Sequence, residues 1–320
     1  MMDTAIGGYF ELELRGGEHY HKDAIRLNTA RNCFEYVLRA RKYDKVFIPY
    51  YTCEVMLEPL KKCNVGYEFY HINELLEPAE EYELKKNEAF LYTNYYGLKQ
   101  SCVERLAVRY GSKLIVDNAQ AFYARPLDGI DVFYSARKFF GVADGAYLYT
   151  DCRLDCEFEQ DQSYDRMSHL LKRADVSAEF GYQDFKANDD LLINNPIRRM
   201  SNLTEKILCS IDYESCRKKR IENYHYLDEH LKDSNKIHFE LTENDVPMIY
   251  PYLTDDADLR NKLIENKVFV AKYWPKVLEW TKVGMLENKL TQNLLAIPCD
   301  QRFGMGDMEE IVNQAKNDLI

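Results

Sequence analysis

Apolar positions in the first half of the chain alternate between short continuous runs and segments with helical spacing. The short runs predict β-strands, which we place at residues 46–49, 67–72, 89–93, 114–116 and 131–134, with a further strand starting at Ala146. The helically spaced segments predict helices over 53–62 and 102–110, and one that opens near Thr29, a residue suited to an N-cap. This alternation with short connections predicts an α/β fold, in which helices cover both faces of a mainly parallel sheet.

The pattern changes on either side of this unit. Residues 1–26 predict an arm with one strand at 9–14, and residues 151–195 predict a helical excursion or a partly mobile loop. A long helix is expected from Arg198 to about residue 231. We therefore predict a large domain over 1–195 and a smaller α+β domain over 196–320. The expected elements of the smaller domain are strands at 248–253, 268–271 and 294–297, a helix at 258–267, and a closing helix capped by Asp307 and Glu310.

Composition narrows the class of protein. The 320 residues are 46% hydrophobic and carry a net charge of −11, which argues against nucleic acid as the main partner. No apolar run approaches the roughly 18 residues of a membrane span, and the N-terminus lacks the pattern of a signal peptide. Nine cysteines without a C-x-x-C pair are expected to be reduced thiols, so we predict a cytoplasmic protein without a membrane partner and without a metal site.

The candidate chemistry lies at strand ends. In such sheets ligands bind beyond the carboxyl ends of the strands, and Asp117 and Lys138 both fall at or just after such ends. The chain has no Walker A loop, no G-x-G-x-x-G and no G-x-S-x-G, so nucleotide-loop and serine-hydrolase chemistry receive no support. What remains is a strand-end acid and a strand-end lysine.

A pyridoxal phosphate site needs these two groups. A lysine binds the cofactor, a carboxylate keeps the pyridine nitrogen protonated, and a helix N-terminus binds the phosphate. Taken singly, Asp117 is more often a solvated strand-end acid, Lys138 a surface lysine and Thr29 only a cap. Their combination and order on the predicted elements favour the cofactor site. The other candidates are Gln120 for the phenolate oxygen, and Arg31 and Ser135 for the phosphate.

Residues 117–121, 133–140 and 144–148 resemble the D-x-A-Q, S-F-x-x-x-K and G-E-G-G segments of the DegT/StrS-type sugar aminotransferases, which are fold type I pyridoxal phosphate enzymes. Residues 27–34 are similar to the family's phosphate segment, 49–53 to its P-x-x-T-F and 94–97 to its H-x-x-G. The resemblance covers most of the chain and is most specific from residue 27 to residue 150.

This resemblance implies a cytoplasmic homodimer that aminates a nucleotide-linked keto sugar in polysaccharide biosynthesis, with glutamate as a usual donor. It implies that Lys138 forms the internal aldimine, that Asp117 pairs with the pyridinium nitrogen and that Gln120 lies by the cofactor oxygen. The further residues that it places at the cofactor are Thr29, Ala30, Arg31, Tyr51, Cys53, Asn94 and Ser135. Tyr95 and Arg199 are the candidates for substrate binding.

The sequence departs from the family pattern at several positions. Phe133 stands where the family has a serine five residues before the lysine, and Ser135 is expected to replace it. Cys53 stands where a ring-stacking aromatic is usual, so Tyr51 or Tyr95 is expected to cover the ring. Two alternatives stay open: other pyridoxal phosphate chemistry on a sugar or an amino acid, and a catalytically silent binding or regulatory homologue. The retained lysine argues against the family's dehydratases, which have histidine there.

Overall fold

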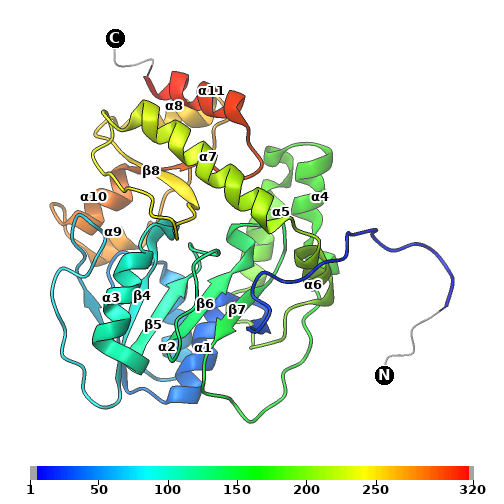
Figure 1. The fold of residues 1–320 in the computed structure, drawn as a ribbon, viewed down its shortest axis with the longest axis vertical. Helices are drawn as coiled ribbons and strands as arrows, with labels where there is room; N and C mark the ends of the chain where they lie inside the picture. The colour runs from blue at the N-terminus through cyan, green and yellow to red at the C-terminus, as the bar shows by residue number, and fades with distance from the viewer. Residues whose placement is uncertain (1–5, 317–320) are drawn as a thin grey trace.

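The computed structural model describes residues 6–316 and contains one large sheet with helices packed around it (Figure 1). The first half of the chain forms β1 (Ile25–Leu27), α1 (Ala30–Arg41), β2 (Lys45–Pro49), α2 (Leu57–Lys62), β3 (Gly66–Tyr70), β4 (Glu88–Thr93), α3 (Gln100–Tyr110), β5 (Leu114–Asn118), β6 (Asp131–Ser135) and β7 (Ala146–Tyr149). The second half forms α4 (Ser168–Asp175), α5 (Ala178–Leu191), α6 (Asn202–Cys209), α7 (Tyr213–Leu231), β8 (Ile249–Leu253), α8 (Leu259–Glu265), α9 (Val277–Trp280), α10 (Leu286–Asn293), β9 (Leu294–Pro298) and α11 (Met305–Lys316). Short 3₁₀ turns lie at η1 (Glu54–Met56), η2 (Tyr95–Gly97), η3 (Gly111–Lys113), η4 (Ala136–Lys138) and η5 (Tyr164–Arg166).

The large sheet has seven strands in the order β1-β7-β6-β5-β4-β2-β3. The run from β3 to β6 is parallel throughout, whereas β7 pairs antiparallel with both β6 and β1. The predicted mainly parallel sheet is therefore confirmed. The three-residue strand β1 was not predicted, because so short a segment has no periodicity of its own.

Successive side chains of each central strand enter opposite faces of the sheet. In β4, Ala89 and Leu91 join the buried cluster on one face, and Phe90 and Tyr92 join the cluster on the other. The first cluster includes residues of α1 and α2, such as Phe34, and the second includes residues of α3. Both faces are buried, which explains why these strands appear in the sequence as continuous apolar runs.

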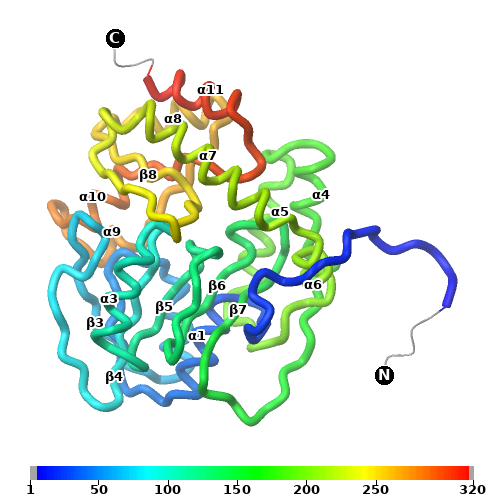
Figure 2. The backbone as a smooth tube through the Cα atoms, viewed as in Figure 1, coloured from blue at the N-terminus to red at the C-terminus, as the bar shows by residue number. Residues whose placement is uncertain are grey.

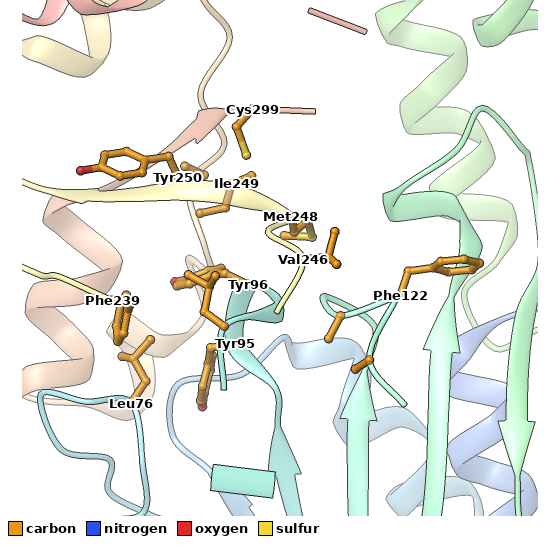
Figure 3. Close-up of a cluster of buried hydrophobic side chains, with 14 of the residues drawn as sticks. Leu76, Tyr95, Tyr96, Phe122, Phe239, Val246, Met248, Ile249, Tyr250 and Cys299 are labelled. Atoms are coloured by element: carbon orange, nitrogen blue, oxygen red, sulfur yellow. The ribbon is translucent and has the colours of Figure 1, made fainter. Parts of the chain in front are cut away.

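The second cluster continues into the C-terminal part of the chain. It joins Tyr95 and Tyr96, beyond the end of β4, to Met248, Ile249 and Tyr250 (Figure 3). In the C-terminal part β8 pairs antiparallel with β9, and α7 and α11 lie beside them (Figure 1). The sheet and the C-terminal part therefore share one core, and the domain boundary near residue 196 stays a prediction.

Several predicted elements of the second half need correction. The segment 151–195 does contain a helical excursion, α4 and α5. The single long helix from Arg198 is wrong: Ser201 caps α6 and Asp212 caps α7, and each side chain accepts a bond from an amide of its own helix. A strand at 268–271 is also wrong, because only Ala271 forms a bridge, to Ala296.

Two terminal expectations also differ from the structure. Residues 9–14 form no strand but an extended, exposed arm that leaves the body of the molecule (Figure 2). The alternation of Phe10, Leu12 and Leu14 therefore reflects no paired strand within the described chain. The closing helix α11 starts at Met305 rather than after Asp307, whose carboxylate accepts a bond from the Gly304 amide at 2.7 Å.

None of the helices between residues 6 and 316 combines the length and apolar character needed to cross a membrane. All nine cysteines are free thiols.

Candidate active site

Three neighbouring parallel strands bring the predicted residues to one edge of the sheet. Thr93 at the end of β4 pairs with Asp117 of β5, and Asn118 pairs with Tyr134 of β6. The chain then turns through η4, which ends at Lys138. Because these strands run parallel, their carboxyl ends meet at one edge, and Asp117 and Lys138 are neighbours although 21 residues separate them.

Asp117 carries a buried carboxylate. Its side chain accepts a bond from the Ala119 amide at 2.8 Å. Burial raises the pKa of Asp117, and the positive charge of Lys138 opposes this rise. Lys138 itself is exposed, so its amine is free to meet a ligand while its charge acts on the buried acid. The pair therefore combines an accessible amine with a carboxylate that gains from a nearby cation.

The charge of Lys138 also acts on Cys53. Burial raises the pKa of the Cys53 thiol to about 11, and Lys138 again opposes the shift. At neutral pH the thiol is therefore protonated, and Cys53 is a small apolar neighbour of Lys138 rather than a nucleophile.

Tyr51 and Tyr95, the expected ring-covering residues, are fully buried. Their rings lie 5.7 Å apart and nearly parallel, and the Tyr95 hydroxyl donates to the Tyr51 carbonyl at 2.8 Å. The Tyr51 hydroxyl shares a 2.8 Å bond with that of Tyr96. In this arrangement they pack against each other beneath the strand ends, and neither offers an exposed ring face to a ligand.

The side-chain amide of Gln120 is hydrogen-bonded through its oxygen but not through its nitrogen. Its oxygen accepts a bond from the Tyr96 amide at 3.2 Å, whereas its buried nitrogen has no partner. The turn that presents the Tyr96 amide is left-handed at Tyr96 and Gly97, with φ of 58° and 74°. A Cβ on Gly97 would lie 2.4 Å from the Val246 carbonyl oxygen, so this turn needs glycine.

Asn94 uses its side chain within its own turn. The oxygen accepts a bond from the Lys99 amide at 3.0 Å, and the nitrogen donates to Gln100 at 3.4 Å. Its backbone amide donates to the Asp117 carbonyl at 3.0 Å. Asn94 therefore joins the ends of β4 and β5 and supports Asp117 from the backbone.

The predicted phosphate end lies at the start of α1. Thr29 caps this helix as expected, since its hydroxyl accepts from the Asn32 amide at 3.2 Å and donates to the Asn32 side chain at 2.7 Å. Ala30 is the first residue of the helix. Arg31 forms an ion pair with Glu58 at 3.0 Å, so its charge already has a partner. Ser135 is buried at the end of β6, opposite Ala146.

Arg199 lies beside the predicted phosphate end, because the Arg198 carbonyl before it accepts a bond from the Asn28 amide at 3.0 Å. It is exposed, and its backbone bridges to Leu27 of β1 and to Gln160. Because β7 separates β1 from β6, this backbone position lies at the far edge of the sheet from β4. The structure thus brings Lys138 near Asp117 and Cys53, and it places Arg199 beside β1 and the start of α1.

Side chains outside the predicted set hold the lysine turn. The buried carboxylate of Asp144 accepts bonds from the Ser201 amide at 2.8 Å and the Ser201 hydroxyl at 2.7 Å. Arg220 and Gln301 both donate to the carbonyl of Phe139, the residue after Lys138. The sequence could have indicated Asp144, because Asp144 and Gly145 form an Asp-Gly pair shortly after the lysine. Nothing in the local sequence signals Arg220 or Gln301, because each reaches the turn from a distant element.

Among residues 6–316 no group of three or more histidine, cysteine or acidic side chains is placed to hold a metal ion.

Comparison with known proteins shows that the chain is similar in fold to solved structures. No family model matches the chain, and no curated protein matches its sequence. Among solved structures it is similar to DesV of S. venezuelae, solved with a ketimine intermediate (TM-score 0.63, 15% identity, 92% of this chain and 84% of that one). It is also similar to a DegT/DnrJ/EryC1/StrS aminotransferase from Brucella abortus (TM-score 0.59, 14% identity, 92% of this chain and 85% of that one). A third similar structure is NtdA from Bacillus subtilis, solved with the cofactor PMP (TM-score 0.61, 16% identity, 92% of this chain and 72% of that one).

These likenesses define the class of fold. The chain has the architecture of fold type I aminotransferases, with a mainly parallel seven-stranded sheet and a smaller C-terminal α+β part. Within that class, the solved structures that it matches include several described as sugar aminotransferases.

Proposed function

We propose that the protein is a pyridoxal phosphate-dependent aminotransferase that acts on a nucleotide-linked keto sugar. One observation carries the proposal: the accessible Lys138 amine lies close enough to the buried Asp117 carboxylate to affect its pKa, at the carboxyl edge of a sheet with this fold. The sugar substrate is suggested by the matched sugar aminotransferases, and the cofactor by NtdA with PMP and Spr1654 in its PLP form.

The residues at this edge fit the cofactor. Asp117 would pair with the pyridinium nitrogen, and the unpartnered amide nitrogen of Gln120 would donate to the phenolate oxygen. Lys138 would hold the cofactor covalently through Nζ. The amides at the start of α1, at Ala30 and Arg31, would bind the phosphate beside Thr29. When bound, pyridoxal phosphate supplies an electron sink for the carbon that gains or loses the amino group.

The chain's own residues would then perform two tasks. A pyridinium cation would stabilise the ionised form of Asp117, because burial alone disfavours that charge. In return the carboxylate would keep the ring nitrogen protonated. Nζ of the exposed Lys138 would take and return the proton at the reacting carbon.

The remaining parts of the proposal rest on the family resemblance. They are glutamate as amino donor, a homodimer, the cytoplasm as location and polysaccharide biosynthesis as role. Tyr95 is buried, so a substrate contact there would need a conformational change. Arg199 is exposed and lies beside β1, next to the proposed phosphate end, and it stays a candidate for substrate binding.

The test is spectroscopic. The wild-type protein mixed with pyridoxal phosphate should develop a visible absorbance band that Lys138→Ala abolishes and that Lys61→Ala, at an exposed lysine of α2, leaves intact. Asp117→Asn should weaken cofactor retention. Titration with an amino-acid panel should convert the band to the amine form, and a keto sugar nucleotide should restore it. Absence of the band in the wild type would refute the proposal, and a band that no donor changes would exclude transamination.

A further inference from the structure

Phe139, the residue that follows Lys138, is held from outside the sheet. The carbonyl oxygen of Phe139 accepts a bond from Gln301 Nε2 at 2.7 Å and from Arg220 Nη2 at 3.5 Å. On the other side of this residue, the Phe139 amide donates to the Ala136 carbonyl at 3.0 Å and closes η4. The Phe140 amide donates to the same Ala136 carbonyl at 2.9 Å. The turn that ends at Lys138 is therefore closed by its own backbone, and two side chains of the C-terminal part hold the Phe139 carbonyl in addition.

Arg220 is the largest of the fully buried side chains, at 1% exposure. Its Nη1 donates to the carbonyls of Pro247 and Met248, each at 3.1 Å, and its guanidinium lies 4.5 Å from the centre of the Phe139 ring. Burial lowers the pKa of Arg220, and the nearby Asp300 opposes this shift. A charge buried against carbonyl groups is costly, so packing alone does not account for an arginine at this position.

The turn that carries the other donor, Gln301, is bonded to the same helix as Arg220. Asn223 follows Arg220 by three residues on α7, so the two side chains share one face of the helix. The Asn223 amide donates to the carbonyls of Cys299, Asp300 and Phe303 at 3.1–3.3 Å. These bonds fix the turn that carries Gln301. One face of α7 thus directs both donors to the Phe139 carbonyl.

We infer that Arg220 and Gln301 are positioning residues for Lys138, through which the C-terminal part of the chain directs the lysine toward Asp117 and Cys53. This inference rests on the proposed cofactor chemistry. Lys138 is exposed, so its direction depends on how the turn at its base is held. Without the two donors the Phe139 carbonyl would lose its bonds to the C-terminal part of the chain, and the bonds from the Phe139 and Phe140 amides to the Ala136 carbonyl would be left to hold the turn. Lys138 would then be held less firmly toward the site.

The decisive variant is Gln301→Leu, because Gln301 is only partly buried and its loss should leave the fold intact. The matched control is Gln314→Leu, at a partly buried position of α11 where the Gln314 side-chain amide donates to Glu310 at 3.2 Å. We would measure how fast pyridoxal phosphate labels Lys138, by quenching with borohydride at set times and quantifying the modified peptide by mass spectrometry. Gln301→Leu should slow labelling about tenfold, as expected when a reacting group is held less well, and should shift the midpoint of the pH titration of the visible band. Gln314→Leu should do neither.

Arg220→Met tests the second donor, with Arg217→Met at a more exposed position of the same helix as control. We expect pyridoxal phosphate to label Lys138 more slowly in Arg220→Met than in Gln301→Leu. The labelling rate should recover in part in Arg220→Lys. If Arg220→Met does not fold, Gln301→Leu decides alone. A wild type with a visible band and equal labelling rates and titration midpoints in the two glutamine variants would overturn the positioning role. A wild type without the band or labelling would instead refute the proposed function.

Discussion

His21 anchors the N-terminal arm beside the loop that carries Gln120. Only 2% of this residue is exposed. Its Nε2 lies 2.8 Å from the Phe122 carbonyl, and its ring centre is 4.1 Å from that of Tyr134. Tyr149 contacts its other ring nitrogen at 3.3 Å. Because Phe122 follows Gln120 by two residues, protonation of His21 should loosen the arm and this loop together.

The size of the effect follows from the pKa. Burial lowers the pKa of His21 to about 4, from 6.5. Between these values the unfolded chain binds a proton that the folded chain does not, so stability falls as the pH drops from 6.5 toward 4 and is fully present above 6.5. Going from pH 7 to pH 5 should cost about 2 kcal/mol of the free energy of unfolding through His21 alone. His19, whose pKa burial also lowers to about 4, acts in the same direction.

The assay is urea unfolding at pH 7 and at pH 5, for the wild type and for His21→Gln. Glutamine keeps a donor for the Phe122 carbonyl but does not titrate, so this variant should lose about 2 kcal/mol less than the wild type between the two pH values. His225→Gln, at an exposed histidine of α7, should follow the wild type. An equal loss in His21→Gln and in the wild type would refute the reasoning.

Two further predictions concern the lysine turn and the phosphate end. Gly145 has a φ of +113°, and a Cβ there would lie 2.9 Å from Thr204 Cγ2, so Gly145→Ala should cost about 2 kcal/mol or more in a denaturant titration. Gly141→Ala, in the same loop but without a contact below 3.7 Å, should cost less, and equal costs would contradict this explanation. Arg31 is paired with Glu58, so Arg31→Met should lose about 2 kcal/mol of unfolding free energy while cofactor affinity, measured by absorbance titration, changes less than in Asp117→Asn. A larger loss of affinity in Arg31→Met would instead show that Arg31 binds the phosphate directly.

The local pattern predicted most of the sheet and part of the site. The strands at 46–49, 89–93 and 114–116 were predictable because both of their faces are buried, which makes the apolar runs continuous. The cap at Thr29 was predictable because it depends on neighbours three residues away. The predictions of a strand in the arm and of one long helix from Arg198 were wrong. Strand pairing depends on contacts with distant residues, and a helix break depends on its caps, and the local pattern of hydrophobic residues shows neither.

The sequence by itself determined the alternating architecture and the order of Asp117, Gln120 and Lys138 along it, since the carboxyl ends of parallel strands must meet at one edge. Only the tertiary structure decided which of the other candidates join them. It buried Tyr51 and Tyr95 in the core, paired Arg31 with Glu58, and placed Arg199 beside β1. It also brought Arg220 and Gln301 to the Phe139 carbonyl from positions 81 and 162 residues away. Contacts over such separations depend on how α7 and the C-terminal turns pack against the sheet, and local periodicity carries no record of that packing.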